Sequence, residues 1–226
     1  MVALTERTVF EHPVSPLVLV TGFDPFGGEA VNPSWLAAQA LHGRRIGGHR
    51  VMAEQLPTVF GPSLTVLRTL VRQHRPALVI CLGLAAGRNA ISIERIAINV
   101  NDARIADNAG EQPIDEPVVA GAPAAYFSSL PIKAMRAALQ AKGIPAEVSQ
   151  TAGTFVCNQV FYGLMHLLAT GRGLKATRGG FIHLPLLPEQ GEPSMPLEQV
   201  VEGLRTGIRT ALATTADARL GAGAIS

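Results

Sequence analysis

The sequence predicts a single α/β domain: a three-layer α/β/α sandwich around a mostly parallel, twisted sheet, with one antiparallel excursion. Short apolar runs alternate along the chain with amphipathic stretches of helical period. The runs are apolar at consecutive positions, as in strands that helices cover on both faces. No repeat, linker or low-complexity segment divides residues 16–215. We therefore expect one domain, preceded by an irregular lead-in over 1–15 and followed by a loose tail over 216–226.

The first half of the chain contains two βα units and a third strand. The run LVLVT at 17–21 ends at a glycine and predicts a buried strand, and a helix over 34–41 follows with a glycine just past its end. HRVMAEQL at 49–56 predicts a second strand. The apolar positions of 61–74 have helical spacing. ALVICLGL at 77–84 is so apolar that we expect it at the centre of the sheet.

The second half departs from simple alternation before it resumes. Isoleucines alternate with other residues through 90–100, which indicates one antiparallel or half-exposed strand. The segment 101–117 is rich in Asp, Asn, Gly and Pro and predicts a polar excursion. The remaining elements follow from the same periodicities: a helix around 131–140, a strand at 146–150, a helix from 155, a strand at 179–187 interrupted by a proline, and a helix at 197–214.

Composition excludes several classes of protein. The net charge is +2 and 5% of the residues are aromatic, so nucleic acid is not an expected partner. No apolar stretch is long enough to span a membrane, and the first 16 residues lack the apolar core of a secretory signal. Two cysteines, Cys81 and Cys157, do not make a disulfide framework, which indicates a reduced, cytoplasmic setting. No cluster or spacing suggests a metal site.

Cys157 is a candidate nucleophile because of its place in TAGTFVCNQVFYGLMH at 151–166. The pattern predicts a helix with Thr154 as N-cap and Cys157 as the third helical residue. The positive end of the helix dipole there favours a thiolate over a thiol, and the thiolate is the reactive species. The alternative is a small residue that only packs at a strand–helix junction.

A cysteine nucleophile needs a base, and His183 is the best placed of the six histidines. It lies in an apolar run toward the carboxyl end of a predicted strand, where sites gather in α/β sheets. His166 is nearest to the cysteine in sequence, but nine residues of helix turn it to roughly the opposite face. The alternative for His183 is a hydrogen-bonded core residue.

Glu94 is the candidate that would orient the imidazole. It is flanked by isoleucines in a predicted strand, where an ionised carboxylate is costly without a partner. Arg95 or Arg104 could be that partner. The alternative is a carboxylate on the exposed face of the strand, paired with a neighbouring arginine.

The loop GFDPFGG at 22–28 follows the first strand. It lacks both the dinucleotide-binding pattern and the phosphate-binding lysine that would follow it. Phe23 and Phe26, held on a Gly/Pro turn, either line a flat apolar slot or fill the adjoining core.

Four segments together resemble the pyroglutamyl peptidase type I family, also called pyrrolidone-carboxylate peptidases. They are VTGFDPFGGEAVNPSW at 20–35, GRNAISIERIAINVNDARIADNAGEQPIDEP at 87–117, AGTFVCNQVFYGLMH at 152–166 and HLPLLPEQ at 183–190. The resemblance extends over about 16–213. It implies a cysteine peptidase that removes an N-terminal pyroglutamyl residue through a thioester, with an α/β/α fold and no metal or organic cofactor. It also implies a cytoplasmic setting and frequently a homotetramer.

By the same resemblance, Cys157 is the nucleophile, His183 the general base and Glu94 the orienting carboxylate. Arg104 falls where the family has a positive group that could help to bind the oxyanion. Backbone N–H groups at Val156 and Cys157 are natural oxyanion donors.

The resemblance also implies how the lactam ring is held. Phe23 and Phe26 would flank the ring, with Asn32 in the supporting loop and Phe155 beside them. Some family members read GQAGGR where this chain has Gly-Leu-Ala-Ala-Gly-Arg at 83–88. A contact made elsewhere by that glutamine side chain would fall here to backbone groups at Leu84.

Two other functions are compatible with the same residues. The first is a nucleoside-phosphorylase-like or other ligand-binding α/β domain, with the glycine loop around an anion and Cys157 only packed. The second is a scaffold that keeps the fold without catalysis.

Overall fold

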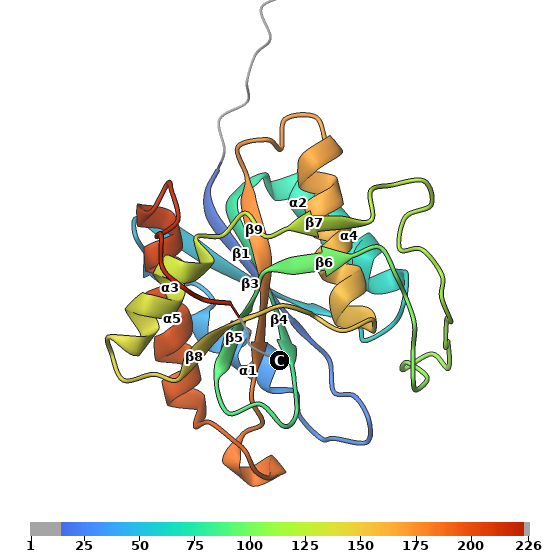
Figure 1. Ribbon diagram of the computed structural model, residues 1–226, viewed down its shortest axis with the longest axis horizontal. Coiled ribbons are helices and arrows are strands. Elements are labelled where there is room, and N and C mark those ends of the chain that lie inside the picture. Colours follow the sequence, from blue (N-terminus) through green and yellow to red (C-terminus); the bar gives the residue numbers. More distant parts are fainter. Residues whose placement is uncertain (1–14, 224–226) are drawn as a thin grey trace, which may run out of the picture.

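The computed structural model describes residues 15–223 of the chain. The expected lead-in over 1–15 therefore lies outside the described residues, except for Ser15, which opens the first strand. Figure 1 shows the arrangement of the elements. The strands are β1 Ser15–Phe23, β2 Arg45–Ile46, β3 His49–Leu56, β4 Pro76–Leu84, β5 Ile91–Glu94, β6 Ile96–Ile98, β7 Ala125–Phe127, β8 Ala146–Ser149 and β9 Arg178–Leu184. The helices are α1 Pro33–Leu41, α2 Pro62–His74, α3 Ile132–Gln140, α4 Val156–Thr170 and α5 Leu197–Ala213, with a short 3-10 turn at Pro188–Gln190.

The central sheet confirms the predicted fold class. Its strand order is β2-β3-β1-β4-β9-β5-β8, with β6 and β7 forming a separate two-stranded sheet. The strands β3, β1, β4 and β9 run parallel to one another, and β5 is parallel to β8. Only the β5–β9 and β2–β3 pairs of this sheet are antiparallel. The carboxyl ends of β1, β4 and β9 therefore meet at one edge of the sheet, where ligands bind in α/β proteins.

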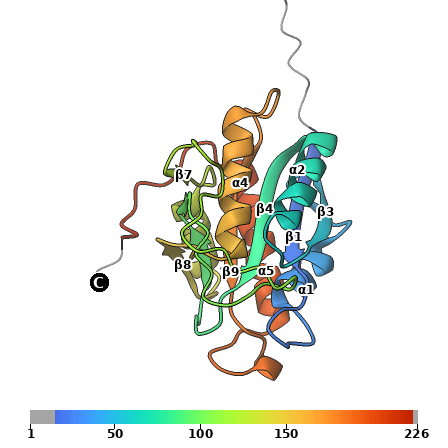
Figure 2. The ribbon, with the colours of Figure 1, turned by 90° about the vertical axis from the view of Figure 1, so that its right-hand side faces the viewer.

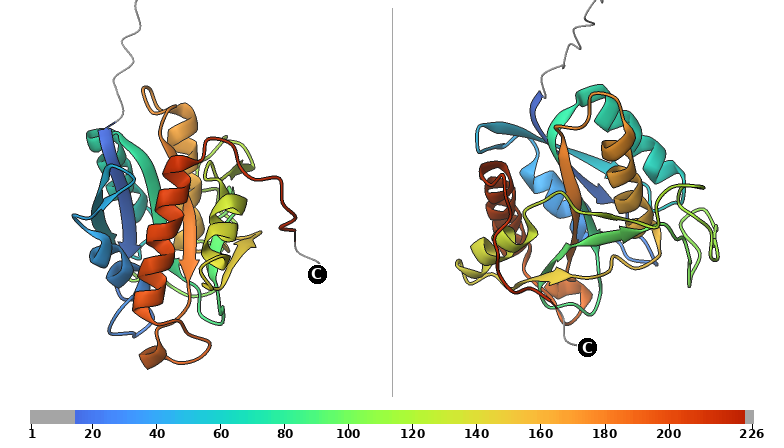
Figure 3. Two further views of the ribbon diagram at one scale, coloured as in Figure 1. Left: turned by 90° about the vertical axis from the view of Figure 1, so that its left-hand side faces the viewer. Right: turned by 45° about the horizontal axis from the view of Figure 1, so that its top comes forward.

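Two hydrophobic cores lie on opposite faces of this sheet. Helices α1, α3 and α5 cover one face, and Figure 3 shows α5 along it. Helices α2 and α4 cover the other face, toward the viewer in Figure 2. Alternation along β9 sends Ile182 and Leu184 into the first core and Phe181 into the second. His183 shares the face of Phe181 by the same alternation, so its imidazole points toward α4.

Two predicted strands differ from the structure. The prediction of a single strand at 90–100 is wrong. This segment forms two strands, β5 in the central sheet and β6 in the small sheet, with Arg95 between them. The Arg95 N–H still bonds to Ser149 of β8, after which the chain leaves the sheet and pairs with β7. The strand expected over 179–187 ends at Leu184, because Pro185 has no N–H to continue the ladder.

The C-terminal segment crosses the outside of α3 and β8. Asp217 accepts hydrogen bonds from the backbone N–H groups of Lys133 and Ala134 at the start of α3. The carbonyl of Ala222 accepts from Arg95 and Gln150. These contacts lie within the tail that we expected to be loose.

In the described part of the chain, no helix is long and apolar enough to cross a membrane.

Candidate active site

The thiol, the imidazole and the carboxylate predicted from the sequence come from the start of α4 and from the neighbouring strands β9 and β5. Cys157 is the second residue of α4, His183 lies on β9 and Glu94 ends β5. The thiol lies directly over Gly83 of β4, since a methyl group added to that glycine would be 2.9 Å from the sulfur. Gly83 is the register partner of His183 on the neighbouring strand. The sulfur therefore lies over the β4–β9 pair that carries the imidazole.

His183 is held by Glu94. Its Nδ1 is 2.7 Å from Oε1 of Glu94, and the two residues are 4% and 0% exposed. A carboxylate only accepts hydrogen bonds, so Nδ1 carries the proton and donates it. In the neutral ring, Nε2 is then left as the proton acceptor. The Phe181 ring, with its centroid 4.8 Å from that of the imidazole, packs against His183.

The partner of Glu94 is Arg88, which sequence reasoning missed. Arg88 Nη1 lies 2.8 Å from Oε1 of Glu94. Arg95, one of the two expected partners, instead donates to Gln150, and Arg104 is an exposed residue of the excursion. Because Glu94 is completely buried, the alternative of an exposed-face carboxylate is also wrong. The sequence did contain a signal for Arg88, because a buried acid needs a cation and Arg88 follows Gly87 in the turn before β5. The φ angle of Gly87 is +86°.

The start of α4 differs by one residue from the prediction. Phe155, not Thr154, is the N-cap, and no side chain caps the helix there. The hydroxyl of Thr154 donates instead to the carbonyl of Asp102, 2.7 Å away, which ties the excursion to the loop before the nucleophile. Val156 and Cys157 thus occupy the first two helical positions, whose N–H groups have no acceptor within the helix.

The electrostatics of the thiol also differ from the expectation of a stabilised thiolate. Burial, followed by the negative charge of Glu94, raises the pKa of Cys157 from 9.0 to about 12, while the charge of Arg88 lowers it. Removing water from around the sulfur thus acts in the direction opposite to the helix dipole. The resting thiol is therefore protonated at neutral pH, and attack requires a base to remove its proton.

An aromatic wall forms around Phe155, two residues before Cys157. The rings of Phe26 and Phe155 have centroids 5.2 Å apart, and Phe60 meets Phe155 edge-on at the same distance. Phe23 is 2% exposed and packs against Phe181, so it belongs to the core. Sequence reasoning did not single out Phe60, which comes from the loop before α2.

Two other expected substrate contacts have structural partners. Asn32 accepts from the backbone and hydroxyl of Ser34 and donates to the carbonyl of Asp24, so its amide caps α1 and holds the loop of Phe26. Leu84 ends β4 opposite Leu184, with its side chain half-buried. Their contacts with a lactam remain predictions.

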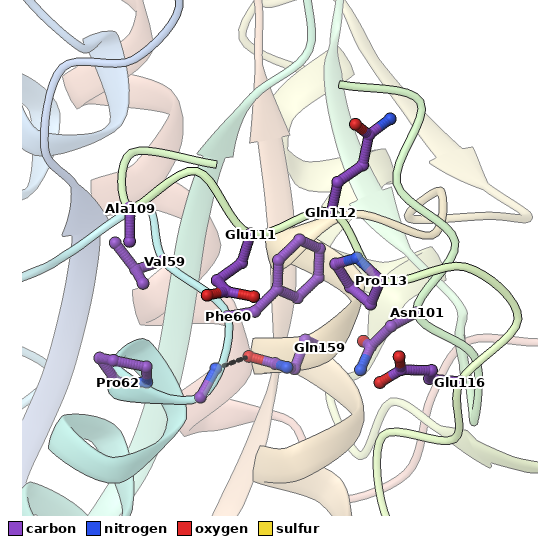
Figure 4. A pocket seen from close by; sticks show the side chains of 11 residues that line it. Val59, Phe60, Pro62, Asn101, Ala109, Glu111, Gln112, Pro113, Glu116 and Gln159 are labelled. Carbon is purple, nitrogen blue, oxygen red and sulfur yellow. Dashed lines mark hydrogen bonds between the residues drawn. The ribbon is translucent and has the colours of Figure 1, made fainter. Parts of the chain in front are cut away.

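A pocket of about 570 Å³ lies beside this site, between the starts of α2 and α4 and the excursion. Figure 4 shows Phe60, Asn101, Glu111 and Gln159 around it. Gln159 accepts a hydrogen bond from the N–H of Gly61, 2.9 Å away, which joins the two helix starts. The lining of this pocket does not include the thiol, the imidazole or the Glu94 carboxylate. Among residues 15–223, no group of three or more His, Cys, Asp or Glu side chains is arranged to hold a metal ion.

A thiol beside an imidazole that a buried carboxylate holds is the side-chain set of a cysteine-dependent hydrolase. Solved structures have the same fold: pyroglutamyl peptidase I from Bacillus amyloliquefaciens superposes with a TM-score of 0.89 at 48% identity, covering 92% of this chain and all of that one. A mutant pyrrolidone carboxyl peptidase from Pyrococcus furiosus gives 0.83 at 46% identity, covering 87% and 98% of the two chains.

The sequence comparisons agree. The family model for pyroglutamyl peptidase matches residues 17–214. The pyrrolidone-carboxylate peptidase of Cupriavidus taiwanensis is 58% identical over 209 residues, 90% of this chain and 96% of that protein. Pyrrolidone-carboxylate peptidase 1 of Ralstonia nicotianae is 60% identical with the same coverage. The chain belongs to the pyroglutamyl peptidase family of cysteine peptidases.

Proposed function

We propose that this protein hydrolyses the bond after an N-terminal pyroglutamyl residue, with Cys157 as nucleophile, His183 as general base and Glu94 as the carboxylate that orients the imidazole. One observation carries the proposal. A completely buried carboxylate, Glu94, lies 2.7 Å from Nδ1 of His183, and the thiol of Cys157 lies over Gly83, the strand partner of His183. A hydrogen bond from Nδ1 to a carboxylate fixes the tautomer of the imidazole and leaves Nε2 able to act as a base.

The proposed reaction has two halves. His183 Nε2 takes the thiol proton as the sulfur attacks the pyroglutamyl carbonyl carbon, and the oxyanion that forms is stabilised by the N–H groups of Val156 and Cys157. The tetrahedral intermediate then collapses to a thioester. The C–N bond breaks, and the imidazolium gives its proton to the leaving amine. In the second half, His183 takes a proton from water, the hydroxide attacks the thioester, and the sulfur leaves with that proton.

The raised pKa of the thiol supports this order of events. Raising it from 9.0 to about 12 lowers the thiolate fraction near neutral pH roughly a thousandfold. Proton transfer to His183 must therefore accompany attack, so that His183 acts as a base and not only as the partner of a preformed thiolate. Glu94 keeps Nδ1 protonated and so presents the Nε2 lone pair to the sulfur.

The substrate proposal rests on the aromatic wall. A pyroglutamyl group has no charged amine, because the lactam contains that nitrogen. It therefore suits a flat apolar slot with a few hydrogen-bonding groups. Two rings that hold a flat guest between them stand roughly 7 Å apart, twice the carbon–carbon contact distance. Phe26 and Phe155 are 5.2 Å apart, so a lactam between them requires the loop that carries Phe26 to move outward.

The remaining residues keep supporting roles in the proposal. Arg104 would reach the site only from the excursion, which the contact between Thr154 and Asp102 ties to the loop before α4. Asn32 would support Phe26 through Asp24, and Leu84 would offer its backbone to the lactam. Phe23, which is buried, would contact the lactam ring only from the core side of the slot.

Release of a chromophore from a pyroglutamyl arylamide tests the proposal. The wild type should turn it over and Cys157→Ser should not, while Cys81→Ser, the matched loss of the other thiol, should remain active. His183→Ala should lose nearly all activity. Full turnover by Cys157→Ser would refute the nucleophile. Absence of turnover by the wild type, with an inert Cys157, would favour a ligand-binding domain.

We also propose a homotetramer in a reducing, cytoplasmic compartment. Both cysteines are free thiols, which suits a reducing setting. Phe127 on β7 and Ile114 on the excursion are 68% and 67% exposed, and both are large apolar side chains that a subunit contact would cover. Light scattering after size-exclusion chromatography measures the assembly. A monomer at assay concentration would refute it.

A further inference from the structure

The Glu94 carboxylate is buried with few hydrogen-bond donors. It is 0% exposed, and both of its donors, His183 Nδ1 and Arg88 Nη1, contact the same oxygen, Oε1. Its second oxygen, Oε2, is buried without a hydrogen-bond partner among residues 15–223. A buried carboxylate stays ionised only when charge and hydrogen bonds compensate for lost hydration. While His183 is neutral, Arg88 supplies the only full positive charge that bonds to Glu94 within the described chain.

Arg88 also contacts the segment that leads to the nucleophile. Its second nitrogen, Nη2, donates to the carbonyl of Thr151 at 3.3 Å, in the loop between β8 and α4. The guanidinium, with its side chain 26% exposed, thus joins the carboxylate of β5 to the loop that ends at α4. A planar fork of fixed donors suits such a bridge better than a single ammonium.

We propose that Arg88 is a positioning residue of the triad: its guanidinium fixes the Glu94 carboxylate so that Oε1 stays aimed at His183 Nδ1. The inference rests on the proposed function, because it assigns Arg88 a part in that same chemistry. The guanidinium acts through Glu94, because Nη1 donates to the same carboxylate oxygen that is bonded to His183 Nδ1. Its effect should therefore fall on kcat and on the pH profile more than on KM.

The charges around the site give the direction of the pH effect. Burial, Glu94 and Cys81 raise the pKa of the Cys157 thiol, and Arg88 lowers it. Glu147 on neighbouring β8 is bonded to Ser92 and not to this group. Without Arg88, the charge that lowers the thiol pKa is lost, so the thiol should become harder to deprotonate and the kcat/KM profile should move to higher pH.

Arg88→Gln, which removes the charge and keeps a donor of similar shape, is the main test. Arg95→Gln is the matched control, since Arg95 lies beside Glu94 in sequence but binds Gln150 and the C-terminal segment. We expect Arg88→Gln to lose roughly 10- to 100-fold in kcat, with KM changed less than about threefold. Arg88→Lys should regain much of the loss, and Arg95→Gln should stay within about twofold of wild type.

A double-mutant cycle separates positioning from a merely structural role. Once Glu94→Gln has removed the carboxylate, adding Arg88→Gln should cost less than about twofold further, because the two residues act as one unit. Equal losses in both backgrounds would overturn the proposal, as would an Arg88→Gln variant that matches the Arg95→Gln control. If Arg88→Gln does not fold, Arg88→Met, which keeps the aliphatic stem but removes the charge, takes its place in the same cycle. An unchanged kcat in that variant would overturn the proposal.

The same assays distinguish the two levels of failure. If Cys157→Ser or Glu94→Gln keeps full turnover, the proposed catalytic groups are wrong. If both lose turnover while Arg88→Gln does not, only the role of Arg88 is refuted.

Discussion

The sharpest prediction concerns Gly83, the residue beneath the thiol. A methyl group added there would lie 2.8 Å from a ring carbon of Phe181 and 2.9 Å from the sulfur of Cys157. Carbon atoms in contact normally stand about 3.5–4.0 Å apart, so the substitution forces a displacement of more than about half an ångström. Gly83 itself lies on β4, a central strand of the sheet, which cannot move away from the added methyl group. We therefore expect Gly83→Ala to push the thiol away from the β4–β9 pair.

The magnitude follows from that displacement. Misplacing a reacting group by about 1 Å costs roughly 10²-fold in rate. Overpacking a close-packed core costs about 1–3 kcal/mol of unfolding free energy. Gly83→Ala should thus lower kcat on a pyroglutamyl arylamide by roughly one to two orders of magnitude, while the protein remains folded.

Gly203→Ala is the matched control. The added methyl would lie 2.5 Å from Ile91 in the core on the other face of the sheet. Part of that overpacking is offset, because alanine favours a helix over glycine by about 1 kcal/mol. Gly203→Ala should change the urea concentration at the midpoint of unfolding but leave kcat within about twofold of wild type, because residue 203 lies across the sheet from the thiol. Wild-type kcat in Gly83→Ala would refute the placement of the nucleophile.

Three further predictions concern stability. Burial raises the pKa of the Cys81 thiol from 9.0 to about 12, so the unfolded chain ionises first and stability falls as pH rises through 9–12. Each such thiol contributes up to about 1.4 kcal/mol per pH unit. Cys81→Ala should therefore lose less stability than the wild type between pH 9 and 11 in denaturant titrations, with unchanged turnover; an identical slope would contradict this. Asn158→Ala should cost about 2–4 kcal/mol, because its buried amide bonds the backbone of Ile98 and Val100 at three points. Asp217→Ala should cost about 1 kcal/mol through its lost bonds at the start of α3, and a change below about 0.3 kcal/mol in urea unfolding would show that the tail does not cap that helix.

The site could be predicted in part because its members carry local signals. Cys157 stands at a strand–helix junction, and His183 lies in a strand that is apolar on both sides. The charge of Glu94 among isoleucines required a partner, and the structure supplies His183 and Arg88 at 2.7 and 2.8 Å. The arginine partner of Glu94 was predicted wrongly, because several arginines lie near Glu94 in the sequence. Only the folded turn before β5 shows which of them reaches the carboxylate.

The sequence by itself determined the α/β/α class, the order of its main elements and the family, because hydrophobic period and long motifs are written in consecutive residues. Only the tertiary structure decided that 90–100 divides between two sheets, that Phe155 is the N-cap, and that Arg88 holds Glu94. It also decided that burial and the charge of Glu94 raise the pKa of the Cys157 thiol. Each of these depends on strand register and on burial. Both are set by groups far apart in the chain, whose energies no local pattern records.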